Sequence, residues 1–339
     1  MADADFSYIV SSLPDYVENN RELISQQIAF GTPTVKRVTP MNAKYKAAIN
    51  MLSLSGSFQN GKGCATEYNS TATLTDREIT TAILERKFRI CPDTLIGKWP
   101  EYLVRIPADK RDSLPFEAFL VAEIITSVND ELETLIWQGK TSTYSGTDLI
   151  NGYLVLAEND ATVIDVTIAA GTSAWKAIKA VIAAVPAALR KKSVKVFVGP
   201  EVFTALAFEL VDANLYHFAP EDDVESLRVP GTNVEVINTP GLAESDRIYA
   251  SILDNMFYGT DDIDAQNRVK VGYNDEKGYF WANVRFNAGV NHAIGKWVVL
   301  GTIGGDLVSP DKASALEAIA ANTAELADAD HVYKTEAAE

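Results

Sequence analysis

The stretch from Gly56 to Gly63 comes closer than any other part of the chain to a known chemical motif. Gly56-Ser-Phe-Gln-Asn-Gly-Lys-Gly63 has nearly the spacing of the phosphate-binding loop of nucleotide-binding proteins. That loop requires Ser or Thr after the lysine to hold Mg²⁺, and a helix whose N-terminus faces the phosphate. Here Gly63 follows Lys62, and residues 64–71 show no helical period. We therefore interpret the stretch as a flexible polar loop tip that exposes Phe58.

The other residue types that could carry chemistry form no recognisable constellation. His217, His292 and His331 lie far apart, and none has a ligand at zinc spacing. There is no Gly-x-Ser-x-Gly nucleophile elbow. Adjacent carboxylates such as Asp261-Asp262 are common in a chain with 46 acidic residues, and a solvated acidic loop explains them better than a catalytic dyad. We expect no catalytic residue, no metal site and no cofactor.

The charge of the chain is unevenly distributed. The net charge is −16, which argues against wholesale electrostatic binding of nucleic acid. Residues 1–112 hold 14 basic and 13 acidic residues, whereas the remainder holds 16 and 33. The two parts could therefore meet across a subunit boundary, or both could be solvated surfaces of mixed sign. No apolar run is long enough to span a membrane, and we expect no membrane partner.

The strongest helical pattern covers residues 114–138. Ser113 and Pro115 are typical of a helix start, and Gly139 is typical of a helix end. Apolar side chains recur every four residues between them, at Phe116, Leu120, Ile124, Val128 and Leu132. A helix of about 25 residues is roughly 37 Å long. Its two apolar flanks predict that it packs between other elements, one of them the sheet expected at residues 268–300.

Residues 268–300 follow the period of two that is typical of strands. In the second run Phe280, Ala282 and Val284 share one face, while Trp281 and Arg285 share the other. Asn274 to Gly278 predicts a hairpin turn with positive φ at the glycine. After a break from Gly289 to Gly295, the run Lys296 to Leu300 predicts a third strand of the same antiparallel sheet. Trp281 and Arg285 are residue types that interfaces favour.

The N-terminal third has little core of its own. Residues 16–30 predict a weak helix, and residues 31–40 an extended arm. Residues 47–54 and 71–90 have β character on either side of the loop tip. A straight β arm of about 20 residues reaches roughly 66 Å, whereas a globule of this chain length is roughly 50 Å across. Such an arm must fold back or lie on a neighbouring chain.

Residues 148–262 predict a separate α/β unit. Helices are expected at 173–189, with a kink or restart at Pro186, and at 201–211. Strands are expected at 194–198, 234–237 and 247–253. Arg190-Lys-Lys192 stands at the helix end that favours cations. The tail, residues 309–339, is acidic and rich in alanine, and fits a short amphipathic helix or a weak coiled-coil seam.

This order of elements resembles the major capsid protein fold of tailed bacteriophages, which encapsulins share. Two stretches add to the resemblance: Asn238-Thr-Pro-Gly-Leu242 leading to Asn255-Met-Phe-Tyr-Gly-Thr-Asp261, and the strands that follow from Val269 to Leu300. The resemblance implies an α+β fold with an N-terminal arm (1–44), an extended β loop (45–98) and a peripheral domain (99–147 and 263–308). In that domain the spine helix is 114–138 and the closing sheet 268–300. The axial α/β domain is then 148–262 and the acidic C-terminal tail 309–339.

The resemblance also implies a function. The chain would be a structural subunit of an icosahedral bacteriophage head that self-assembles into pentamers and hexamers around double-stranded DNA, without sequence-specific contact. It would be assembled in the host cytoplasm, reside in the virion capsid, and have a separate scaffolding protein, a portal and decoration proteins as partners. The expected assembly contacts are Phe58, Gly61, Lys62, Gly63, Trp281 and Arg285.

Two other functions remain compatible with the sequence. One is an encapsulin-like nanocompartment shell, with the same fold and a different cargo. The other is an intracellular α/β enzyme or nucleotide-binding protein, which would retain nucleotide and lose it on Lys62→Ala.

Overall fold

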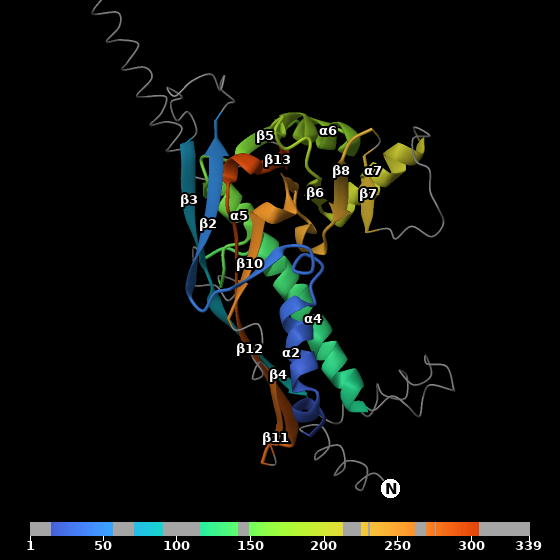
Figure 1. Ribbon diagram of the computed structural model, residues 1–339. Coiled ribbons are helices and arrows are strands. Elements are labelled where there is room, and N and C mark those ends of the chain that lie inside the picture. The colour runs from blue at the N-terminus through green and yellow to red at the C-terminus, as the bar shows by residue number, and fades with distance from the viewer. Residues whose placement is uncertain are drawn as a thin grey trace, which may run out of the picture. The chain divides into compact units, whose positions relative to one another are not determined.

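Figure 1 shows a computed structural model of the chain. It describes residues 15–56, 71–90, 116–141, 149–212, 225–229, 231–261, 269–274 and 276–304. These residues belong to two units. The first comprises residues 1–152 and 253–293, and the second comprises residues 153–252 and 294–339. No described helix is long and apolar enough to cross a membrane.

In the described part of the first unit, helices α2 and α4 accompany a five-stranded sheet and a two-stranded hairpin (Figure 1). The sheet has the order β1-β10-β12-β11, and β4 also pairs with β12. The separate hairpin consists of β2 and β3. The bounds are α2 Arg21–Phe30, β1 Thr39–Asn42, β2 Lys46–Ser55, β3 Thr71–Thr80, β4 Ala82–Ile90, α4 Phe116–Gln138, η3 Leu253–Asn255, β10 Met256–Thr260, β11 Val269–Asn274 and β12 Tyr279–His292.

The predicted spine helix is confirmed from Phe116 to Gln138. Leu120, Ile124, Val128 and Leu132 are all buried, as their spacing predicts. The helix ends before Gly139, whose N–H donates to the Leu135 carbonyl over 2.9 Å. Gly139 is required for space, because a Cβ there would lie 2.5 Å from the Ile150 carbonyl oxygen.

The second unit is built on a six-stranded sheet of order β5-β13-β9-β6-β8-β7. Helices α6 and α7 contact each other, and their buried side chains join those of the strands in one core. The bounds are α5 Tyr153–Asn159, β5 Ile164–Ile168, α6 Ala174–Ala184, β6 Val194–Val198, α7 Pro200–Asp212, β7 Ser226–Arg228, β8 Val234–Asn238, η2 Pro240–Leu242, β9 Arg247–Ser251, η4 Gly295–Trp297 and β13 Val299–Ile303. Helix α6 ends at Ala184, two residues before Pro186, because proline restricts the residue that precedes it.

Two predictions for the sheet of residues 268–300 are wrong. The third run forms β13, which pairs with β5 and β9 in the second unit and not with β12. Gly289 is not a break either, because β12 continues through it to His292. The period of two could not show this, since an alternating strand fits either sheet. The alternation itself is confirmed: Phe280, Ala282 and Val284 are buried, and Gly278 has φ of +63°.

The extended arm predicted at residues 31–40 is also wrong for most of its length. Residues 33–37 form turns, with Lys36 N–H donating to Thr32 O and Val38 N–H donating to Thr34 O. Only Thr39–Asn42 are extended, as β1, which runs parallel to β10. The turns form because Thr32, Thr34 and Val35 are buried within the unit, where their polar groups need partners.

Candidate assembly surface

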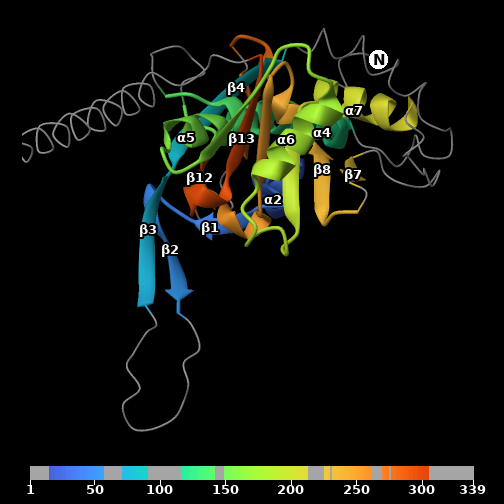
Figure 2. The same ribbon diagram turned by 90° about the horizontal axis from the view of Figure 1, so that it is seen from above.

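The β2–β3 hairpin forms a two-stranded sheet of its own within the first unit. Its two strands pair in register from Lys46 opposite Thr80 to Ser55 opposite Thr71. Figure 2 shows both strands running away from β1 and β12, the strands of the same unit at their base. A two-stranded hairpin is marginal in water unless it packs on another surface. The arrangement therefore calls for a partner along the outer half of the hairpin.

One face of the outer half is apolar. Leu74 pairs with Leu52, and Leu54 pairs with Ala72, so these positions lie on the same side of the ribbon. Leu54 is 74% exposed and Leu74 is 66% exposed. Burying a leucine side chain contributes about 1.5–3 kcal/mol relative to leaving it in water. We call this surface, defined by Leu54, Ala72 and Leu74, the leucine face.

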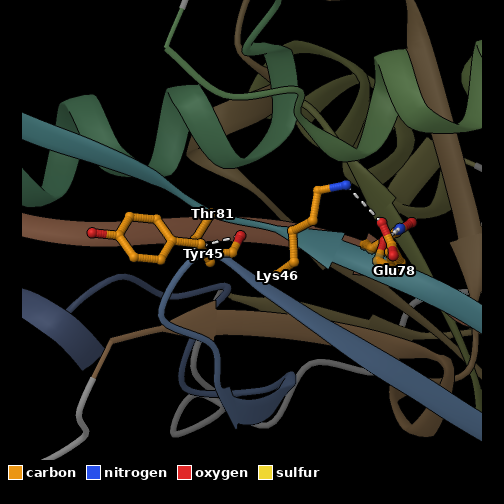
Figure 3. A network of polar contacts seen from close by, with 5 residues as sticks. Tyr45, Lys46, Glu78 and Thr81 are labelled. Atoms are coloured by element: carbon orange, nitrogen blue, oxygen red, sulfur yellow. Dashed lines mark hydrogen bonds and ion pairs between the residues drawn. The ribbon is translucent and has the colours of Figure 1, made fainter.

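The base of the hairpin, by contrast, is tied firmly to the sheet. Ile49 and Ile79 are buried there, and Asn291 Nδ2 donates to the Glu78 carbonyl over 2.7 Å. Thr81 N–H donates to Tyr45 O over 2.8 Å, which closes the strands at their base (Figure 3). The base can thus hold the direction of the outer half while that half remains exposed.

Two glycines make room for this attachment. Gly259 on β10 and Gly289 on β12 stand opposite each other in the sheet. A Cβ at Gly289 would lie 2.3 Å from Thr80 O, and one at Gly259 would lie 3.0 Å from Ile79 Cδ1. Glycine inside a strand often marks a place where another backbone approaches closely. Here the backbone that approaches is the end of β3.

A buried carboxylate holds the N-terminal turn against the spine helix. Glu133 on α4 is 2% exposed, and its two oxygens accept from Thr34 N–H, over 3.2 Å, and from the Thr34 hydroxyl. Trp137 Nε1 donates in turn to Thr34 Oγ1 over 2.7 Å. Burial raises the pKa of Glu133, although the hydrogen bonds from Thr34, Thr32 and Trp137 oppose that shift. The turn and the helix therefore behave as one body.

Trp281 and Arg285 lie on the exposed face of β12, as their alternation predicted. The Trp281 side chain is placed over β11, because a Cβ at Gly272 would lie 2.6 Å from its Cζ2. Arg285 stands opposite Glu85 on β4, and Asn283 Nδ2 donates to Glu85 Oε1 over 2.9 Å. That hydrogen bond is the main cause of the lowered pKa of Glu85. The two predicted residues thus belong to one polar sheet face.

A small open groove lies between α4 and the strands β4 and β12. Its apolar lining residues are Leu84, Val128, Leu132, Leu135, Leu149 and Phe286, and the charged residues Glu85, Arg86 and Glu131 also line it. Arg86 links β4 to the helix. Its guanidinium is 2.7 Å from Glu131 Oε2 and donates to Ser127 O over 2.6 Å. The groove is therefore bounded by elements that are held together.

The other predicted contacts, Phe58, Gly61, Lys62 and Gly63, lie outside the described residues. Residue-by-residue reasoning missed Leu54 and Leu74, although the sequence carried a signal. Apolar residues alternate with Ser and Thr in Leu52-Ser-Leu-Ser55 and in Ala72-Thr-Leu-Thr75, which predicts one apolar face. In a segment without a core of its own, such a face indicates a contact. Within the part of the chain that the structure describes, no group of histidine, cysteine or carboxylate side chains could hold a metal ion.

Comparisons with known proteins identify the fold. No family model matches the sequence, and no curated protein does. A chain from the satellite phage P4 procapsid including the size determination (Sid) protein matches with a TM-score of 0.58 and 14% identity, over 85% of this chain and 92% of that chain. A chain from Gordonia phage Cozz matches with a TM-score of 0.51 and 10% identity, over 80% and 86%. The chain therefore has the fold of tailed-phage major capsid proteins, as the order of its elements predicted.

Proposed function

We propose that this chain is the structural subunit of a closed icosahedral bacteriophage head, assembled from pentamers and hexamers around double-stranded DNA. The observation that carries the proposal is the fold shared with the P4 procapsid chain over 85% of this sequence. In this proposal the chain packs on neighbouring copies of itself to build the shell and catalyses no reaction. Its site is the virion capsid, and a separate scaffolding protein, a portal and decoration proteins are its partners.

The leucine face supports the proposal from within the molecule. A hairpin whose base is anchored while its apolar outer face is exposed suits an arm that packs on the next subunit. The groove between α4 and β4–β12 is our candidate receiving surface, because most of its lining residues are apolar. Permanent interfaces of this kind bury about 2,000–5,000 Å², so the assembled shell would stabilise each subunit by mass action.

The sheet face of Trp281 and Arg285 is a second proposed contact. It displays an exposed tryptophan beside charged residues of both signs, including Glu85 and Lys87 on β4. Tryptophan and arginine carry a large share of the binding energy in many interfaces. Phe58, Gly61, Lys62 and Gly63 remain proposed contacts at the tip of the loop.

Light scattering after size-exclusion chromatography, together with negative-stain imaging, tests the proposal on the full chain. Closed megadalton particles would support it, and rings of five or six would support it with a missing scaffolding protein. A monomer that persists at high concentration would contradict it.

The leucine face is tested by Leu54→Ser/Leu74→Ser. We expect a subunit with unchanged thermal stability that no longer forms shells. Leu23→Ser on α2 is the control, because Leu23 is also largely exposed but lies outside the hairpin. Normal shells from the double variant would remove the leucine face from the proposal.

A further inference from the structure

The second unit contains a basic stretch that contrasts with the acidity of the chain. Residues 166–200 hold six basic residues and no acidic residue, although the chain as a whole has 30 basic and 46 acidic residues. The six are Lys176, Lys179, Arg190, Lys191, Lys192 and Lys195. The stretch forms α6, the turns after it and β6. Its charge is therefore concentrated on one helix and the segment that follows.

Two lysines form an exposed row on α6. Lys176 and Lys179 are exposed and three residues apart, so they are neighbours on the helix surface. Arg190 extends the row at the C-terminal end of α6. Its guanidinium donates to Ala183 O over 2.8 Å and to Val185 O over 3.1 Å. This contact agrees with the prediction that a cation stands at this helix end, and it fixes one charge in place.

Two more lysines follow directly after Arg190. Lys191 and Lys192 are both exposed, and the Lys192 Nζ lies 4.8 Å from the ring centroid of Trp297. In the same way, the Lys179 Nζ lies 5.0 Å from the ring centroid of Trp175. Both tryptophans are thus partly covered by lysine stems, which leaves the charges outermost.

The sixth basic residue of the stretch, Lys195, is neutralised. Lys195 is part-buried and forms an ion pair with Glu235 on β8. By contrast, the described residues provide no carboxylate partner for Lys176, Lys179, Lys191 or Lys192. We call these four lysines and Arg190 the basic patch.

The surroundings of the patch indicate the kind of ligand that it fits. None of the large exposed apolar side chains of the described residues lies between 166 and 200, although Phe208 and Val211 are exposed on α7, which contacts α6. Protein partners are usually anchored by apolar or aromatic side chains, and the five residues of the patch itself supply none. Lysines without apolar anchors suit the regularly charged backbone of a nucleic acid, which is bound through release of its counterions.

We propose that the basic patch binds the phosphate backbone of duplex DNA without reading its sequence. The acidity of the chain does not prevent this, because charges more than about 8 Å apart are largely screened at physiological salt. The biological setting rests on the proposed function, since a head subunit is exposed to packaged DNA. The binding itself is a property of the unassembled subunit and can be measured separately.

The experiment compares two full-length variants that lose the same charge. One is Lys176→Gln/Lys179→Gln/Lys191→Gln/Lys192→Gln. The control is Lys44→Gln/Lys140→Gln/Lys270→Gln/Lys277→Gln, which neutralises four exposed lysines of the first unit. Binding of a short fluorescein-labelled duplex to unassembled subunits is followed by fluorescence anisotropy between about 50 mM and 200 mM salt. Shell formation by each variant is imaged in parallel.

The patch variant should bind DNA at least about tenfold more weakly than the control at the lowest salt. Each phosphate contact contributes about 0.9 to the slope of log K against log salt, so the slope should fall by about 3 to 4. Equal binding by the two variants would overturn the proposal, and the proposed function would stand if both still form shells. Tighter binding to a peptide of residues 309–339, which hold seven acidic and two basic residues, would also overturn it in favour of an acidic protein ligand.

Discussion

The N-terminal turn and the β2–β3 hairpin belong to the same unit, but their charged side chains make contacts of opposite kinds. The turn is fastened to α4 through Glu133, Thr34 and Trp137, all of them buried. Along the hairpin, the ion pair between Lys46 and Glu78 joins side chains that are more than half exposed, over 2.9 Å (Figure 3). The first contact is shielded from water, whereas the second is surrounded by it.

The difference indicates which segments are held by contacts within the subunit and which segments can pack on a neighbouring subunit. A buried polar group without a partner carries its full desolvation cost, so the turn must stay in place once it has docked. An exposed ion pair contributes little. The outer half of the hairpin has the exposed leucine face, and it gains most by packing on another surface. A shell subunit that meets both five-fold and six-fold neighbours would need a firm body and an adaptable arm.

Among the substitutions that probe this contrast, Glu133→Ala should destabilise the subunit most. It leaves the Thr34 N–H and hydroxyl without their acceptor in a buried site, and it removes side-chain volume. The free energy of unfolding should fall by about 2–4 kcal/mol, as measured by chemical denaturation of the subunit. Glu131→Ala is a suitable control, because Glu131 is half exposed on the same helix. If both variants have the same free energy of unfolding, the buried hydrogen bonds of Glu133 do not hold the turn more firmly than exposed contacts hold the hairpin.

Gly289→Ala should have the next largest effect, because the new Cβ would meet the backbone of β3. The base of the hairpin would have to shift, which we expect to lower the free energy of unfolding by about 1–3 kcal/mol. Gly272→Ala is the matched comparison. Its Cβ would meet only the ring of Trp281, an exposed side chain that can move aside. Similar melting temperatures for the two variants would show that the hairpin base is less firmly placed than its contacts indicate.

The sequence predicted individual helices and strands better than it predicted which elements contact one another. The spacing of Leu120, Ile124 and Val128 determines a helix by itself, because the buried stripe lies within one segment. Whether the strand at Val299–Ile303 joins β12 or β9 depends on contacts with distant residues, and its alternation fits both. The role of Glu133 in holding the N-terminal turn was not predicted, and the reason is related. A glutamate in a helix is ordinary until Thr34, 99 residues away, is brought against it.

Glu133 should also make stability depend on pH. Its raised pKa means that the folded subunit holds the proton more tightly than the unfolded chain does. The free energy of unfolding should therefore fall as pH rises from the unfolded pKa, about 4.5, through the folded pKa. Glu133→Gln imitates the protonated side chain and cannot ionise, so it should lack this component.

The measurement is the difference in unfolding free energy between Glu133→Gln and the unchanged chain, across that pH range. Other carboxylates titrate in both proteins and cancel in the difference. The unchanged chain should lose stability relative to the variant as pH rises. A constant difference would mean that the hydrogen bonds from Thr34 and Trp137 offset the burial of the charge.

Lys46→Gln should have the smallest effect. This substitution tests the exposed ion pair, just as Glu133→Ala tests the buried hydrogen bonds. Both side chains of the pair with Glu78 are more than half exposed, so loss of the pair should change the free energy of unfolding by less than about 1 kcal/mol. Added salt should reduce even that difference, because it screens exposed charges. The check is chemical denaturation of the variant and the unchanged chain at low and high salt. A loss as large as that of Glu133→Ala would mean that the exposed ion pair holds its part of the unit as firmly as the buried hydrogen bonds hold the turn, and the contrast between the two would fail.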